Sequence, residues 1–275
     1  MKTLIKRNMK LYFRDKAGIF FSMLSILIII ALFALFLGQG FGDRHILDSW
    51  LMAGILAVAS LTTSIGAFEI IISDRINKVA KGFYASPVKR SHITASYIIS
   101  PFVAGVIMTT LTAIGFSIYI IARGGGLPGP VGLLLLVGLI LLSNITGTAI
   151  LCFIISLIKS MSVWGTVGTI IGTLSGFLMG VYMPIGQLPT AVQYVMIAFP
   201  PFHSAMLYRQ ILTPWSIDYT YIASGGELNI AELNELLGTT FSFGDFQITP
   251  IMSVGYLVIS GLVFYWLATM KMRKL

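Results

Sequence analysis

The stretch from Ser73 to Thr94, Ser-Asp-Arg-Ile-Asn-Lys-Val-Ala-Lys-Gly-Phe-Tyr-Ala-Ser-Pro-Val-Lys-Arg-Ser-His-Ile-Thr, separates two uncharged apolar runs that are each long enough to cross a bilayer. It carries five basic residues and one acidic residue. A basic connection of this kind is typical of the cytoplasmic face of a membrane. Its apolar side chains recur at helical spacing, at Ile76, Val79, Phe83 and Tyr84. We therefore expect a short amphipathic helix on that face, ended by Ser86-Pro87.

The composition is that of a membrane protein. Hydrophobic residues make up 56% of the 275 residues and charged residues 10%, with a mean hydropathy of +0.91, whereas soluble domains contain about 25% charged residues. A net charge of +8 would suggest a nucleic-acid partner in a soluble protein. Here the distribution of charge across the membrane explains it, so we expect no nucleic-acid partner. The single cysteine, Cys152, excludes an internal disulfide and a zinc site built from thiolates.

The apolar runs predict an all-α integral membrane protein with six transmembrane helices. Residues 1–16 are basic with an apolar stripe, which indicates an interfacial amphipathic helix on the cytoplasmic side. Residues 17–275 then form a single transmembrane domain. The expected spans are residues 17–37, 50–68, 95–122, 132–158, 161–182 and 248–270.

The region between the fourth and last spans decides the span count. Residues 160–208 form a run of 49 residues without a formal charge, which is too long for one span. Both termini are basic and should share the cytoplasm, so the number of spans must be even. We therefore expect residues 161–182 to cross once. The helical segment 184–208, interrupted by prolines, should dip into the membrane from the outer face and return.

This topology places 15 of the 18 basic residues on the cytoplasmic side, in agreement with the positive-inside rule. The exceptions are Arg44, Arg123 and Arg209. Residues 213–249 then form an extracytoplasmic loop, in which residues 228–237 can form a short helix ended by Gly238.

The loop 73–94 resembles the first cytoplasmic loop of type-2 ABC transporter permeases. That loop usually reads Glu-Arg or Glu-Lys, then Leu or Phe, then Ser/Thr-Pro, and here Asp74-Arg75, Phe83 and Ser86-Pro87 occupy those places. Asp replaces the commoner Glu without changing the charge. Leu188-Pro189 and Tyr208-Arg209 are similar to the family's segment after span five, although Phe199 stands where the family has Asn. The resemblance covers nearly the whole chain.

The resemblance implies the membrane subunit of an ATP-driven exporter in a bacterial or archaeal inner membrane, with both termini cytoplasmic. A separate cytoplasmic ABC ATPase would bind ATP and Mg, and this chain has no Gly-x-x-x-x-Gly-Lys-Ser/Thr phosphate loop. We expect no catalytic residue, cofactor or metal in this chain. The residues expected to couple to the ATPase are Asp74, Arg75, Asn77, Lys78, Val79, Phe83, Ser86 and Pro87. Alternatively, the basic residues only fix the topology and bind anionic membrane lipid.

Span five contains small residues at four-residue spacing, which lets helices approach closely in lipid. Two interpretations stay open: packing within the chain, or contact with a second permease chain, identical or different, along the translocation path. The residues concerned are Gly168, Thr169, Gly172, Thr173, Gly176 and Gly180. A polar group in span four, Asn144, Thr146 and Thr148, is better explained by internal hydrogen bonds.

Ionisable residues are nearly absent from the spans, which argues against a carrier driven by protons or sodium. Glu69, the closest candidate, is either an interfacial residue or a gate partner at the inner mouth. The three histidines lack metal-ligand spacing. An apolar interior with scattered hydroxyls suits a hydrophobic or amphipathic cargo, such as a drug, a peptide or a lipid-linked molecule. The alternative functions are a polytopic membrane enzyme and an ATP-independent carrier.

Overall fold

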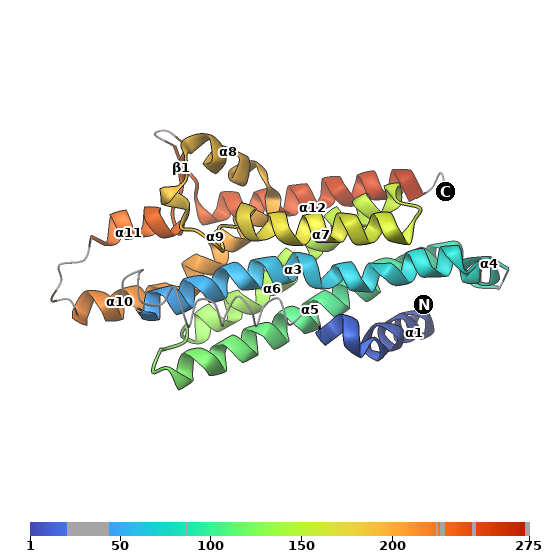
Figure 1. Ribbon diagram of the computed structural model, residues 1–275, viewed down its shortest axis with the longest axis horizontal. Coiled ribbons are helices and arrows are strands. Elements are labelled where there is room, and N and C mark those ends of the chain that lie inside the picture. Colours follow the sequence, from blue (N-terminus) through green and yellow to red (C-terminus); the bar gives the residue numbers. More distant parts are fainter. Residues whose placement is uncertain (21–43, 86, 224, 226–228, 244–245, 273–275) are drawn as a thin grey trace.

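The computed structural model describes residues 1–20, 44–85, 87–223, 225, 229–243 and 246–272, which form an elongated helical bundle (Figure 1). Five described helices are long and apolar enough to cross a membrane. They are α3 (Arg44–Ile76), α5 (Arg90–Ala122), α6 (Pro130–Leu157), α7 (Met161–Leu178) and α12 (Pro250–Met272). These helices confirm an apolar helix at each of the last five expected spans. Most of the expected first span, 17–37, lies outside the described residues, so the count of six stays a prediction.

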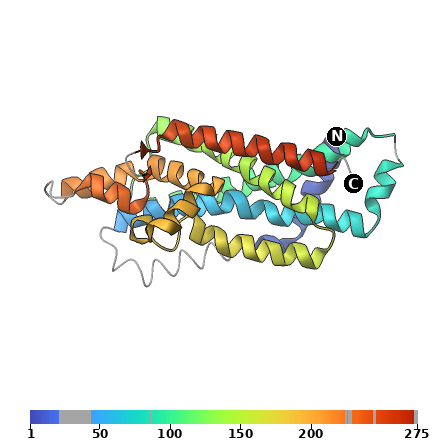
Figure 2. The same ribbon diagram turned by 90° about the horizontal axis from the view of Figure 1, so that it is seen from above.

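The two ends of the bundle differ in what they carry. Helix α1 (Lys2–Arg14), helix α4 (Val79–Tyr84) and the end of α12 lie at one end (Figures 1 and 2). Helices α10 (Pro214–Ala223) and α11 (Ile230–Leu237) lie at the opposite end, where α3 begins. We call these the α4 end and the α11 end. The arrangement matches the predicted grouping, in which loop 73–94 shares one face with both termini.

Helix α3 is longer than the span expected at residues 50–68. It is already helical at Arg44, so residues expected in a polar outer loop are helical. The reason is packing: Ile46 and Leu47 are buried against α10 and α11. Asp48, also buried, pairs with Arg123 Nε at 3.2 Å. Burial of one face therefore keeps these residues helical, although their hydropathy does not suggest a span.

The centre of the bundle is packed through a glycine on α5. A Cβ at Gly105 would overlap the side chains of Ser64 on α3 and Asn144 on α6, so glycine lets the three helices meet without moving these side chains. Asn144 Nδ2 donates to the Ile140 carbonyl at 2.8 Å. Thr146 Oγ1 donates to a carbonyl of α12 at 3.1 Å. The internal hydrogen bonding expected for this polar group is confirmed for Asn144 and Thr146. It is wrong for Thr148, whose buried hydroxyl has no hydrogen-bond partner in the described part of the chain.

The segment 184–208 forms two short helices and not a span. They are α8 (Thr190–Ala198) and α9 (Pro200–Leu212), preceded by the single turn η2 (Ile185–Gln187). Pro189 precedes the first residue of α8, and prolines occupy the first turn of α9, where a missing N–H costs nothing. His203 fixes the bend, because its two ring nitrogens lie 2.9 Å from the Ile197 carbonyl oxygen and 3.1 Å from Ser253 Oγ.

Residues 213–249 contain the short helix that the sequence predicted. Helix α11 is capped by Asn229, whose side chain accepts the Glu232 N–H at 3.3 Å. It ends at Gly238, whose φ of 69° lies in the left-handed region that favours glycine. Beyond it, β1 (Ser242–Phe243) pairs with β2 (Phe246–Gln247) in antiparallel register. These two pairs of residues are the only strands in the described part of the chain.

Candidate functional site

The α3–α5 connection differs from the single amphipathic helix that the sequence predicted. Helix α3 continues through Asp74 and Arg75 to Ile76, and α4 begins at Val79. Between them Lys78 adopts a φ of 58°, which a non-glycine residue occupies at a cost of about 1–2 kcal/mol. Asn77 Nδ2 donates to Ser73 Oγ at 3.2 Å beside this turn. The apolar residues of the loop therefore belong to two helices with different directions.

Asp74 joins three helices at the α4 end. Arg7 of α1 donates to both carboxylate oxygens, with Nη1 at 2.6 Å from Oδ2 and Nη2 at 2.8 Å from Oδ1. Tyr97 of α5 donates its hydroxyl to Oδ2 at 2.6 Å. Only 6% of the Asp74 side chain is exposed. The hydrogen bond to Asp74 raises the pKa of the Arg7 guanidinium. Bidentate, charge-assisted bonds of this kind are among the strongest in proteins.

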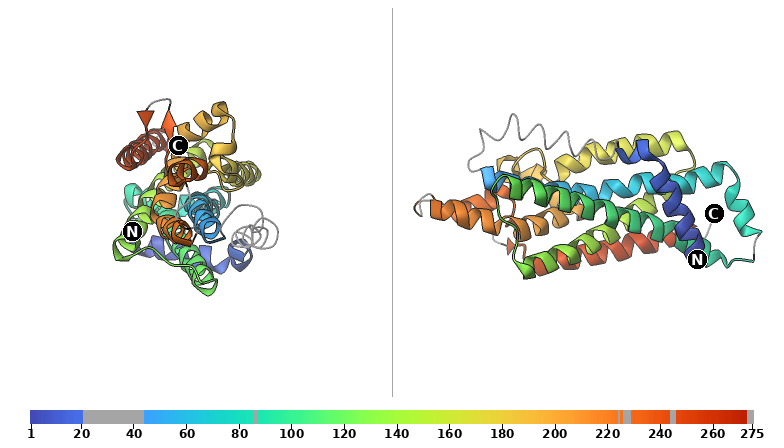
Figure 3. Two further views of the ribbon diagram at one scale, coloured as in Figure 1. Left: turned by 90° about the vertical axis from the view of Figure 1, so that its left-hand side faces the viewer. Right: turned by 90° about the horizontal axis from the view of Figure 1, so that it is seen from below.

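Arg7 also reaches α4. Its guanidinium lies over the Phe83 ring, 5.1 Å from the ring centroid, within the range of a cation–π interaction. Helix α1 lies across the bundle here, against α3 and α5 (Figure 3). Phe83 is consequently half-buried against the protein's own Arg7. We call the group Arg7, Asp74, Phe83 and Tyr97 the α1 junction. The sequence hinted at it only through the lone acidic residue of a basic loop.

Two apolar residues beside the Lys78 turn face outward at the α4 end: Ile76 is 53% exposed and Val79 is 38% exposed. Arg75 and Lys78 beside them are also exposed. We call these four residues the tip patch. Pro87 is exposed too, and Ser86 lies outside the described residues. Among the expected coupling residues, the structure therefore separates an outward-facing set from Asp74 and Phe83, which are used inside the chain.

The small residues of α7 have different surroundings. Gly168 faces Ile65 of α3, and the Tyr182 ring covers Gly176. Nothing in the described part of the chain approaches Gly172 within 4 Å of where a Cβ would lie. Thr169 and Thr173 are exposed. The two interpretations of this pattern therefore apply to different residues: packing within the chain at Gly168 and Gly176, and an open face around Gly172.

Gly180 lies beyond the end of α7 and not on this open face. Its φ is 64°, and a Cβ there would crowd Ile185 and Arg209. Arg209 of α9 is fully buried and donates Nη2 to the carbonyls of Met179 and Gly180, at 2.7 and 2.8 Å. Its guanidinium also lies over the Trp50 ring, 5.4 Å from the centroid. Arg209 thus fastens the end of α7 to α3 and α9, a role the sequence did not reveal.

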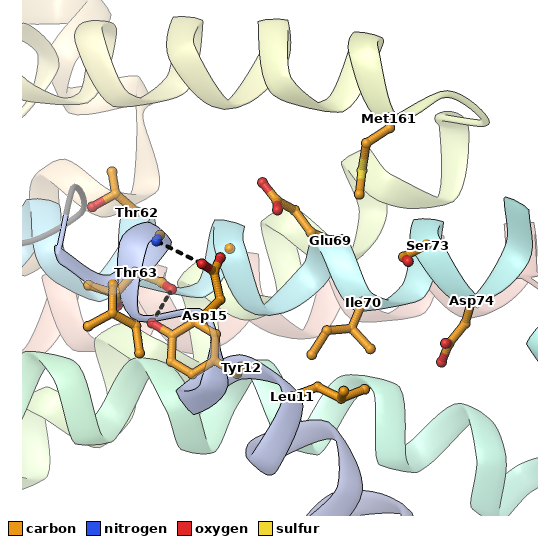
Figure 4. A pocket seen from close by; sticks show the side chains of 13 residues that line it. Leu11, Tyr12, Asp15, Thr62, Thr63, Glu69, Ile70, Ser73, Asp74 and Met161 are labelled. Atoms are coloured by element: carbon orange, nitrogen blue, oxygen red, sulfur yellow. Dashed lines mark hydrogen bonds between the residues drawn. The ribbon is translucent and has the colours of Figure 1, made fainter. Parts of the chain in front are cut away.

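Two adjoining cavities lie beside α3, and Glu69 lines both. The first, about 320 Å³, lies between the end of α1, α3 and Met161 (Figure 4). The second, about 520 Å³, is a groove between α3 and α7. Thr62 and Gly66 also line both cavities. In Figure 4 the Glu69 side chain points from α3 towards α7.

These features define a multi-pass membrane protein whose helices enclose polar groups at one end and an open groove along one side. The family model of the ABC-2 type transporter matches residues 1–213. The chain belongs to this family, as its resemblance suggested, and is a transmembrane permease of the ABC transporter class. Members of the family normally pair with an ABC ATPase. A comparison with curated proteins gave no match.

Proposed function

We propose that this chain is the membrane subunit of an ATP-driven exporter, and that a separate cytoplasmic ATPase, which carries ATP and Mg, docks on the tip patch. The observation that supports this most is the α1 junction. Asp74 binds Arg7 and Tyr97, and Arg7 covers Phe83. A displacement of α4 is therefore passed to α3 and α5, the two longest helices of the bundle, instead of being absorbed in the loop.

The same proposal sets the orientation and the cargo. The α4 end faces the cytoplasm of a bacterial or archaeal cell, because the basic residues concentrate there. Exposed basic side chains of α1, such as Lys2 and Lys10, also contact anionic lipid. The groove between α3 and α7 forms part of the translocation path for a hydrophobic or amphipathic compound. The large apolar share of its lining supports this class of cargo.

Replacing Ile76 and Val79 together with serine is expected to weaken ATPase binding about tenfold or more, because an aliphatic side chain buried at an interface contributes ~1.5–3 kcal/mol. The measurement is the amount of ATPase that co-purifies with tagged permease from its native membrane. Ile222→Ser is the matched control, since Ile222 is 77% exposed at the opposite end. It should change nothing. If the double variant still co-purified with the ATPase and Lys89→Ala did not, the docking proposal would be wrong. The loop would then be an electrostatic membrane anchor.

The exposed face of α7 supports a second part of the proposal, contact with another permease chain, identical or different. Gly172→Leu should then remove most of the cross-linking between permeases through a cysteine at Thr173, because leucine would hold the chains apart. Gly138→Leu on α6 is the control, since its site is equally open. Cross-links that persist in Gly172→Leu, or that never form in the parent, would assign the small residues to packing within one chain.

A further inference from the structure

Glu69 is a half-buried carboxylate for which the described residues provide no hydrogen-bond donor and no basic partner. It lies on α3 within a helix long and apolar enough to span the membrane. A carboxylate partly removed from water is costly unless a positive charge compensates it. Asp74, on the same helix, has such a partner in Arg7. The missing partner of Glu69 is therefore a property of this site and not of α3 as a whole.

The surroundings of Glu69 carry an excess of negative charge. No Lys, Arg or His is among the described residues that line either cavity. Asp15 and Asp74 also line the first cavity. Arg7 compensates the charge of Asp74, whereas Asp15 Oδ1 accepts only the Gly18 N–H, at 2.9 Å. Because low-dielectric walls strengthen such a field, both cavities attract cations and repel anions.

The groove on the α7 side of Glu69 is suited to an apolar molecule. Its volume of about 520 Å³ lies within the ~300–1,000 Å³ range of pockets that hold drug-sized ligands. Its walls consist of aliphatic side chains, small residues and one tyrosine. The groove-lining residues that are remote from Glu69 in the sequence include Ile55, Val58, Gly172, Thr173, Val181 and Tyr182.

We propose that Glu69 binds the positive charge of an amphipathic organic cation whose apolar body lies in the α3–α7 groove. The inference rests on the proposed function, since it names the chemical class of the cargo. Charge complementarity selects a cation, and the apolar walls select an organic one. A divalent metal ion is a poorer fit, because it requires several oxygen ligands around one point, whereas Glu69 faces an apolar groove on one side.

The test uses two ions of the same shape and opposite charge, tetraphenylphosphonium and tetraphenylborate. Binding of each to purified permease in a neutral detergent is measured by equilibrium dialysis without any ATPase. The phosphonium should bind saturably and the borate at least about tenfold more weakly, and Glu69→Gln should lose about tenfold in phosphonium affinity, as expected when a charge-assisted contact is removed. Glu69→Asp should keep part of it. Glu235→Gln, an exposed carboxylate on α11, should bind as the parent does.

Equal binding of the two ions by the parent protein would overturn the proposal, as would unchanged phosphonium binding by Glu69→Gln. Glutamine has the same shape and removes a half-buried charge, so the variant should fold. If it did not, the comparison of the two ions on the parent protein would decide alone. Because no ATPase takes part, a negative result leaves ATP coupling intact. Conversely, a permease that binds the phosphonium but never co-purifies with an ATPase would refute only the coupling.

Discussion

Replacing Arg209 with alanine is expected to have the largest effect on stability of any single substitution at the α11 end. The change removes both hydrogen bonds to the carbonyls of Met179 and Gly180, at 2.7 and 2.8 Å. It also leaves a cavity beside Trp50, whose ring lies under the guanidinium. Two carbonyls without a donor and a cavity of this size together lower the free energy of unfolding by about 3–5 kcal/mol. Part of this loss is offset, because the variant no longer buries a charged group.

The measurement is the thermal unfolding midpoint of purified protein in one detergent, followed by tryptophan fluorescence. Trp50 contacts Arg209 directly, so its emission should also shift in the folded variant. Arg209→Lys should be intermediate, because one ammonium group lacks the planar fork and the ring contact of arginine. Arg44→Ala is the control, since Arg44 is exposed at the same end. An Arg209→Ala protein with the parent midpoint would show that the end of α7 needs no fastening.

The spans were predictable because a bilayer imposes its thickness on the sequence. Each of the last five apolar runs is a helix in the structure, and the prolines at 189, 200 and 201 mark the starts of α8 and α9. Gly238 likewise marks the end of α11. In each case the cause is local: the solvation of one segment, a missing N–H, or a positive φ. Local causes leave a signature that can be found in the sequence.

The boundaries of α3 were not predictable in this way. Hydropathy measures how well a segment dissolves in lipid. The span predicted from it therefore started only at Trp50, although the chain is already helical at Arg44. What keeps the extra turns helical is packing against α10 and α11, together with the pair between Asp48 and Arg123. These partners are remote in sequence. The same limit applies to Lys78. Its positive φ could not be predicted, because lysine has no preference for that conformation.

The three basic residues that the topology placed outside illustrate the same limit. By charge alone Arg44, Arg123 and Arg209 are equivalent exceptions to the positive-inside rule. In the structure they differ completely: Arg44 is exposed, Arg123 pairs with Asp48, and Arg209 is buried. A count of charges shows on which side a loop lies. It does not show which of those charges the fold uses.

The coupling residues stay a prediction, but the structure corrects one grouping among them. Spacing placed Phe83 beside Val79 on one apolar face. The break at Lys78 and the contact with Arg7 divide that face, so Phe83 is half-buried while Ile76 and Val79 are exposed. The hydrogen bond between Arg7 and Asp74 joins residues 67 positions apart, so it produces no periodic pattern in the sequence. The structure was therefore needed to distinguish the residues that are exposed to a partner from those that pack within the chain.

The α1 junction leads to the second large effect. Arg7→Ala and Asp74→Ala should each abolish most of the ATP hydrolysis that the permease stimulates in its partner, because either change removes the ion pair that joins α1 to α3 at the α4 end. Asp74→Ala should be the more severe, since Tyr97 also loses its acceptor. Lys6→Ala is the control on the same helix, where Lys6 is exposed.

The double variant decides whether Arg7 and Asp74 act as one unit. If they do, combining the two alanines should cost little more than Asp74→Ala alone, with a coupling energy of about 1–3 kcal/mol in the double-mutant cycle. The cycle is measured on thermal unfolding and on ATPase stimulation with equal permease levels in the membrane. Losses that simply add would mean that α1 and α3 contribute independently. In that case α4 would drive α3 without α1, and the junction would serve only to hold the N-terminal helix in place.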